Sequence, residues 1–156
     1  MNTDNPFTAA ERLESLKVAV VGGITAGFLS LVLLFIHRGA IADPHLFATL
    51  FTLNLATLTL LVHVAIGSLS GALFALVYRY AIRTDQNPQL NMGVVLAFTL
   101  VRGLALVDVG SAIGQHFLPF FLACGESFIL FGLTSLILTF AMQRQWLKPF
   151  LGNITP

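Results

Sequence analysis

The sequence predicts an all-α, polytopic membrane protein with four transmembrane helices and an N-terminal interfacial helix. Three observations lead to this class. Of the 156 residues, 56% are hydrophobic and only 10% are charged, unlike an ordinary soluble domain. Apolar runs continue for longer than a water-soluble core requires, as they do in transmembrane helices. Most Lys and Arg residues fall on one side of four predicted crossings.

The first predicted elements are a lead-in helix and a span. Residues 1–17 are expected to form a cytoplasmic amphipathic segment whose helix starts near Ala9. The apolar segment 18–36 follows and, as a helix, is long enough to cross the hydrocarbon layer. A cleaved signal peptide is the alternative, because Ala40-Ile41-Ala42 has the pattern of a cleavage site. The length of the apolar core and the acids before it favour a retained anchor.

The second apolar run is too long for one straight crossing. We expect a transmembrane helix at 57–78, preceded by a tilted or interfacial helix at 44–56. Two crossings within this run are disfavoured, because they would move Arg79 and Arg83 to the side that has few positive residues.

The third and fourth spans are predicted at 92–113 and 118–142, with almost no loop between them. Four crossings place the Lys and Arg residues of both termini and of the middle loop on one side, and Arg38 on the other. The positive-inside rule then predicts that both termini are cytoplasmic, or stromal in a thylakoid. Residues 18–142 thus form the membrane domain, and 143–156 form a cytoplasmic tail.

Small residues recur on the first two spans at the spacing of a close helix contact. Gly23 and Gly27 lie one turn apart on the first span, and Gly67 and Gly71 lie one turn apart on the second. Such stripes let another helix backbone approach closely. The pattern therefore predicts two helix-packing faces and leaves their partners open.

Arg102, Asp108 and Glu126 form a predicted charge cluster within the last two spans. A central Arg or Asp costs on the order of 3 kcal/mol on an insertion scale, so these charges are expected to face one another and not lipid. Arg102 and Asp108 point about 120° apart on one helix, which makes Glu126 the better partner for Arg102. The cluster is interpreted either as an ion pair that holds the helices in register or as a proton, ion or polar-ligand site.

The polar run YRYAIRTDQNPQLNM, residues 78–92, is predicted to be a cytoplasmic loop, with Asn91 capping the third span. Its candidate interaction residues are Arg79, Arg83, Asp85, Asn87 and Pro88.

A resemblance rests on this loop and the helix after it. The run YRYAIRTDQNPQLNMGVVLAFTLVRGLALVD resembles a signature of a small, poorly characterised integral membrane protein family of cyanobacteria and chloroplasts, over about residues 69–109. The resemblance implies a location in the thylakoid or plasma membrane and an accessory role in the biogenesis of photosynthetic complexes.

No cofactor or metal site is predicted, and a bound pigment or lipid is left open. His63 lies within the second span and is a weak candidate ligand for a haem or chlorophyll metal, since a lone intramembrane histidine is more often a packing residue. The single cysteine excludes a disulfide within the chain. A net charge of +1 gives no electrostatic basis for binding nucleic acid. No catalytic motif is found, and a lipid enzyme built on His116, Asp108 and Glu126 is the alternative to a non-enzyme.

These observations predict a non-enzymatic accessory protein that contacts membrane lipids and docks with other integral membrane proteins. The alternative is a small proton- or ion-coupled transporter that uses the charge cluster. The few polar residues in the spans and the lack of an internal repeat favour the accessory role.

Overall fold

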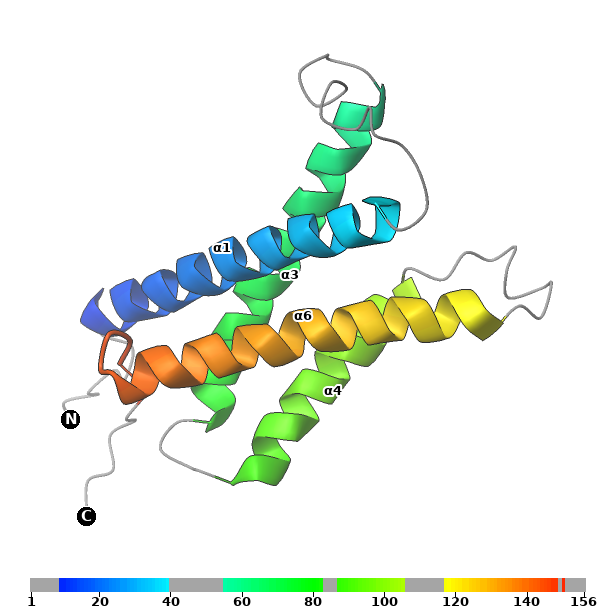
Figure 1. Ribbon diagram of the computed structural model, residues 1–156. Coiled ribbons are helices and arrows are strands. Elements are labelled where there is room, and N and C mark those ends of the chain that lie inside the picture. Colours follow the sequence, from blue (N-terminus) through cyan, green and yellow to red (C-terminus); the bar gives the residue numbers. More distant parts are fainter. Residues whose placement is uncertain (1–8, 40–54, 83–86, 106–116, 149, 151–156) are drawn as a thin grey trace, which may run out of the picture.

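The computed structural model describes residues 9–39, 55–82, 87–105, 117–148 and 150. Over these residues the protein is all-α. Its helices are α1 (Ala9–Gly39), α3 (Leu55–Ile82), α4 (Pro88–Ala105) and α6 (Phe117–Gln143) (Figure 1). In Figure 1, α1 and α6 run in opposite directions across the view, and α3 and α4 cross them steeply.

Within the described ranges, three helices are long and apolar enough to cross a membrane. They are Ala9–Ile36, Leu58–Ile82 and Phe120–Gln143. The all-α class is confirmed, and these three helices have the length and composition of membrane spans. The third predicted crossing, 92–113, corresponds in part to α4, and its remainder, 106–113, lies outside the described residues, as does most of the predicted helix at 44–56.

The boundaries of two elements differ from the prediction. Residues 9–17 continue into the first apolar segment as one helix, α1, so the lead-in is not a separate element. Helix α3 continues past Tyr78 to Ile82, and Arg79 therefore lies in a helix and not in the predicted loop. The polar character of residues 78–82 comes from side chains that the fold buries or pairs, which a loop prediction based on polarity does not anticipate.

The predicted cap of the third span is also wrong, because Asn87 and not Asn91 caps α4. The side-chain Oδ1 of Asn87 accepts a hydrogen bond from the backbone N–H of Gln89 at 3.0 Å. Pro88 then occupies the first helical position, where its missing N–H has no effect on the helix. Asn91 lies inside the helix and is free to use its side chain elsewhere.

Helices α1 and α3 approach each other through glycines. A Cβ atom placed on Gly22 would collide with Ala75, and one on Gly27 would collide with Ser68. A Cβ on Gly71 would lie 2.7 Å from the carbonyl oxygen of Gly22. No larger side chain fits this contact, so the small residues of the two helices pack against each other. All four glycines singled out in the sequence lie in it: Gly23, Gly27, Gly67 and Gly71.

Helices α4 and α6 approach each other closely at Gly103. A Cβ on Gly103 would lie 2.6 Å from Cys124 Sγ and 3.0 Å from its Cα. By contrast, a Cβ on Gly93 of α4 or on Gly132 of α6 would meet no atom within 4 Å. The two helices are therefore close at Gly103 and leave open space around these other glycines.

Aromatic rings fill the centre, where α3, α4 and α6 meet. Phe74 is fully buried, and its ring centroid lies 5.1 Å from that of Phe131 and 5.4 Å from that of Phe98. Tyr78 packs on the other side of Phe74 at 5.4 Å. These tilted and edge-to-face contacts are the geometries that aromatic pairs prefer.

The chain turns back on itself after α6. Gln145 adopts a φ of 58°, and its N–H donates to the carbonyl of Met142 at 3.0 Å. The N–H of Trp146 donates to the carbonyl of Ala141, also at 3.0 Å. This pair of bonds is a Schellman motif that ends the helix. It directs the following residues, including the buried Leu147, back toward the body of the protein.

Candidate functional site

A small polar cavity lies where the described helices converge. Ser30 of α1, His63 of α3, Arg102 of α4 and Glu126 of α6 all line it, together with two leucines. Its volume of about 10 Å³ is close to the space that one water molecule needs. The cavity therefore brings an arginine, a carboxyl group, an imidazole and a hydroxyl together between apolar helices.

Arg102 is largely enclosed at this cavity, with 9% of its surface exposed. Its Nη1 donates a long hydrogen bond of 3.5 Å to Ser70 Oγ. The carboxyl group of Glu126 lines the same cavity. Arginine carries five N–H donors, so Arg102 retains capacity for further hydrogen bonds within the cavity.

Several buried hydroxyls accompany this arginine. Ser30 Oγ, Thr99 Oγ1 and Ser127 Oγ are buried and have no hydrogen-bond partner within the described part of the chain. Ser30 lines the cavity, Thr99 lies nearly one turn before Arg102 on α4, and Ser127 follows Glu126 on α6. A buried hydroxyl without a partner costs about 1–3 kcal/mol, so a water in the cavity would relieve Ser30 in particular.

The cavity combines a carboxyl group and an imidazole with a guanidinium. Among the described residues, no group of three or more His, Cys, Asp or Glu is placed to hold a metal ion. Carboxyl and imidazole groups as a class can exchange protons. Asp108 and His116 lie outside the described residues, so the structure places only Arg102 and Glu126 of the predicted charge cluster.

A second polar network surrounds Arg79, which is fully buried. Its Nε donates to the carbonyl of Lys148 at 2.9 Å. Its Nη1 donates to Ser15 Oγ at 2.5 Å and to the carbonyl of Glu11 at 3.5 Å. Its Nη2 forms an ion pair with Glu11 Oε2 at 2.6 Å. One side chain thus joins α1, α3 and the segment after α6.

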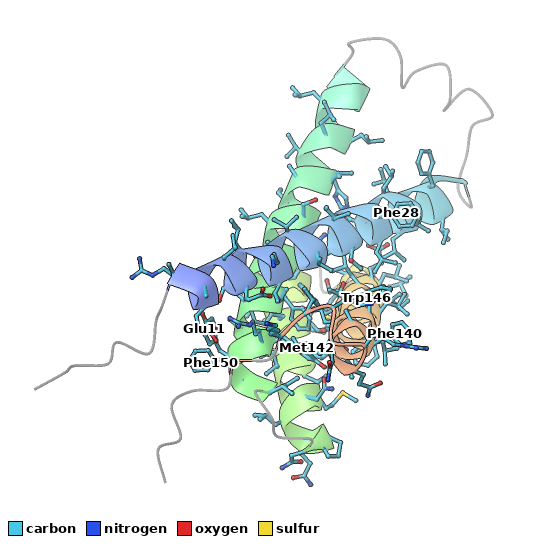
Figure 2. All side chains as sticks on the ribbon, turned by 90° about the vertical axis from the view of Figure 1, so that its left-hand side faces the viewer. Glu11, Phe28, Phe140, Met142, Trp146 and Phe150 are labelled. Atoms are coloured by element: carbon cyan, nitrogen blue, oxygen red, sulfur yellow. The ribbon has the colours of Figure 1, made fainter. Side chains whose placement is uncertain are left out.

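Aromatic rings enclose this guanidinium. It lies 5.6 Å from the ring centroid of Tyr80 and 5.9 Å from that of Phe150, within the range of cation–π attraction. The two rings pack edge to face at 5.0 Å, and the hydroxyl of Tyr80 is hydrogen bonded with Ser15 Oγ at 2.7 Å. Figure 2 shows Glu11 and Phe150 at this end of the molecule. All the contacts of Arg79 described here are made with groups of the chain itself.

The residues predicted to form an interaction loop lie in different surroundings. Arg79 is buried in the network just described and is not an accessible interaction residue. Asn87 and Pro88 are exposed at the start of α4. Arg83 and Asp85 lie outside the described residues.

Sequence reasoning placed Glu126 near Arg102 but missed the partners of Arg79 and the serines beside Arg102. For Arg79 these are Glu11, Ser15 and the carbonyl of Lys148, from the two ends of the chain. The available signal was an acid and a cation at the same predicted membrane face, in the lead-in and at the end of the second span. For Arg102, Ser70 and Ser30 carry no sequence signal that sets them apart from other serines in membrane helices.

Comparisons with protein-family models, with curated proteins and with solved structures find no match for this chain. What the site does must therefore follow from its own geometry.

Proposed function

We propose that this chain is a non-enzymatic accessory protein of the membrane that docks with other integral membrane subunits. The buried charges support this role. Arg79 uses its donors within the chain, and Arg102 lies in a cavity with room for about one water. Arg79 holds helices together, and a polar substrate pathway needs a wider polar lining than the cavity at Arg102 has.

The observation that carries the proposal is the apolar surface left open on the long helices. Only 28–33% of the most apolar window of each of the three candidate spans is buried inside the protein. Large side chains such as Phe28 of α1, Leu69 of α3 and Leu136 of α6 are 64–65% exposed. In a membrane these faces meet lipid or the helices of a partner, and the small-residue contact of α1 with α3 is an example of close helix packing within the chain.

In-membrane photocrosslinking tests the docking role. A photoreactive phenylalanine analogue at Phe28, which is 65% exposed, is expected to give a discrete protein adduct in native membranes. The same analogue at Phe74, which is fully buried, is the matched control and should yield only bonds within the chain. Lipid adducts alone from Phe28, Leu69 and Leu136, with a solitary species in mild detergent, would refute docking.

The location and topology belong to the same proposal. The chain is proposed to cross four times, with α4 in the third crossing, residues 9–17 at the interface and both termini cytoplasmic or stromal. The pairing of Arg79 with Glu11 supports this, since it puts the start of α1 and the end of α3 on one side. The resemblance of residues 69–109 supports a thylakoid or plasma membrane and a role in the biogenesis of photosynthetic complexes.

Single cysteines test the topology. In a Cys124→Ala background, Arg12→Cys and Gln143→Cys both place a thiol at an exposed position near one end of the chain. Both thiols are expected to react with a membrane-impermeant maleimide in inside-out vesicles and to be protected in right-side-out vesicles. Opposite labelling of the two would exclude an even number of crossings.

The second candidate is a small proton- or ion-coupled transporter. One observation favours it: Glu126, His63 and Arg102 line the same enclosed cavity. Proton flux into liposomes that contain the purified protein is the test. Flux that is abolished by Glu126→Gln and kept by Glu14→Gln, an acid at the start of α1, would establish transport. Absence of flux in the wild-type protein would leave docking alone.

A further inference from the structure

A groove of about 510 Å³ separates the first half of α4 from the middle of α6. Met92 and Val95 line it from α4, and Phe128, Gly132 and Leu136 line it from α6. A Cβ on Gly132 would meet no atom within 4 Å, so the floor of the groove is unfilled by the protein. The helices separate here because their close contact lies at Gly103, near the other end of α4.

The shape and lining of the groove suit a lipid chain. From Phe128 to Leu136 it extends about 12 Å along α6, most of the depth of one leaflet of a bilayer whose core is about 30 Å thick. Its lining is almost entirely apolar.

One end of the groove is polar. Asn91 of α4 and Ser135 of α6 are among its lining residues. Both lie within reach of the hydroxyl of Tyr78, which is hydrogen bonded with Thr139 Oγ1 at 2.6 Å. An occupant with an apolar body and a polar group at one end matches this division.

A positive charge lies just beyond that end. The guanidinium of Arg144 stacks on Phe140, 5.2 Å from the ring centroid, and Trp146 packs against the same ring at 6.5 Å. Phe140 follows Leu136 by about one helical turn, or about 5.4 Å. Figure 2 shows Phe140 and Trp146 together at this end of α6. Arginine and tryptophan are the residues that meet phosphate groups and glycerol esters at a membrane surface.

We propose that the α4–α6 groove is a binding site for one acyl chain of an anionic glycerophospholipid. The chain lies over Gly132, the glycerol ester region lies at Asn91 and Ser135, and the phosphate reaches Arg144. The lipid completes the packing of two helices that touch closely at Gly103 and are apart at Gly132. This site is independent of whether the protein docks with other subunits.

Photolabelling of the reconstituted protein tests the site. The vesicles consist of phosphatidylcholine with a trace of phosphatidylglycerol that carries a diazirine in the middle of one acyl chain, and adducts are mapped by mass spectrometry. We expect adducts at Met92 and at Phe128, which are exposed in the groove, to exceed those at Leu100 and Leu118, which are exposed outside it, by about fivefold. The same probe with a phosphatidylcholine headgroup is expected to label the groove about threefold less.

Three variants separate this site from general lipid contact. Gly132→Leu fills the groove and is expected to reduce the adducts at Met92 about fivefold. Gly125→Leu is its matched control on α6, because a Cβ there also meets no atom within 4 Å but the residue does not line the groove. Arg144→Gln should abolish the preference for the anionic probe, whereas Arg12→Gln, a change at an exposed cation of α1, should not.

The distribution of adducts in the wild-type protein tests the proposal even if a variant fails to fold. Adducts spread evenly over all exposed apolar residues would overturn the proposal. So would labelling of Met92 and Phe128 that Gly132→Leu leaves unchanged in a folded protein. A crosslink that joins the grooves of two copies of this chain would overturn it as well, because the second copy would then occupy the space.

Discussion

The two buried arginines of this protein have opposite surroundings. Arg79 is fully buried, and it donates hydrogen bonds to Lys148, Ser15 and Glu11, the carboxylate of Glu11 being one of the acceptors. Arg102 has one hydrogen bond within the described residues, of 3.5 Å to Ser70, and shares a small cavity with Glu126. Arg79 thus makes four hydrogen bonds with its five N–H donors, and Arg102 makes one with a described residue.

This difference in hydrogen bonding distinguishes a buried charge that stabilises the fold from a buried charge at a candidate site. A buried charge is tolerated when hydrogen bonds satisfy it, and its removal then leaves the partners unpaired. A buried charge with spare donors beside unpartnered hydroxyls is suited to a water, a proton or a ligand. Arg79 is accordingly a residue that holds the fold together, and Arg102 belongs to the candidate site.

The largest expected effect comes from replacing Arg79. Arg79→Met is expected to lower the free energy of unfolding in detergent micelles by about 3 kcal/mol, because Glu11 and Ser15 lose their partner. This value lies at the low end for a buried pair, since 28% of the Glu11 side chain is exposed. Arg79→Lys should recover little of it, because a single ammonium cannot replace the planar fork.

Arg12→Met, at an exposed cation one residue after Glu11, is the control and should change stability by less than about 0.5 kcal/mol. Equal effects of the two substitutions would show that the Arg79 network does not stabilise the protein.

The second test replaces Arg102. Arg102→Met is expected to lower stability by about 1–2 kcal/mol, because an apolar side chain of similar length fills the space while Glu126 loses its countercharge. Adding Glu126→Gln should recover part of this loss. A double-mutant cycle measures the coupling, which we expect to be about 1 kcal/mol. A coupling near zero would separate Arg102 from Glu126 and remove the basis of the transport alternative.

Much of this comparison lay beyond the sequence, for physical reasons. Glycine spacing and the length of an apolar run are local properties of the sequence, so the small-residue stripes and the long helices could be predicted. The partners of Arg79 come from positions near both ends of the chain, and only the packed fold brings them together. The polar run around Arg79 was predicted as a loop because polarity alone does not distinguish a solvated side chain from one that other residues satisfy.

The serines that accept from the two arginines give a finer test. Ser15→Ala removes an acceptor that lies 2.5 Å from Arg79 and 2.7 Å from the hydroxyl of Tyr80, and should cost about 1.5 kcal/mol. Ser70→Ala removes a contact of 3.5 Å to Arg102 and should cost less than about 0.5 kcal/mol. Thermal unfolding of the two variants, side by side in one micelle, measures the difference. A larger loss of stability for Ser70→Ala than for Ser15→Ala would contradict the inference that the chain binds Arg79 more firmly than Arg102.

The smallest expected effect concerns the turn that brings the Lys148 carbonyl to Arg79. Gln145 has a φ of 58°, a left-handed conformation that costs a non-glycine residue about 1 kcal/mol, and glycine is the preferred residue at this position of a Schellman motif. Gln145→Gly should therefore raise the free energy of unfolding by about 0.5 kcal/mol after the greater flexibility of the unfolded chain is included. If the turn serves the Arg79 network, this gain should shrink in the Arg79→Met background and persist in the Arg102→Met background. A gain of equal size in all three backgrounds would show that the turn and the network are energetically independent, and the C-terminal segment would then be only a neighbour of Arg79.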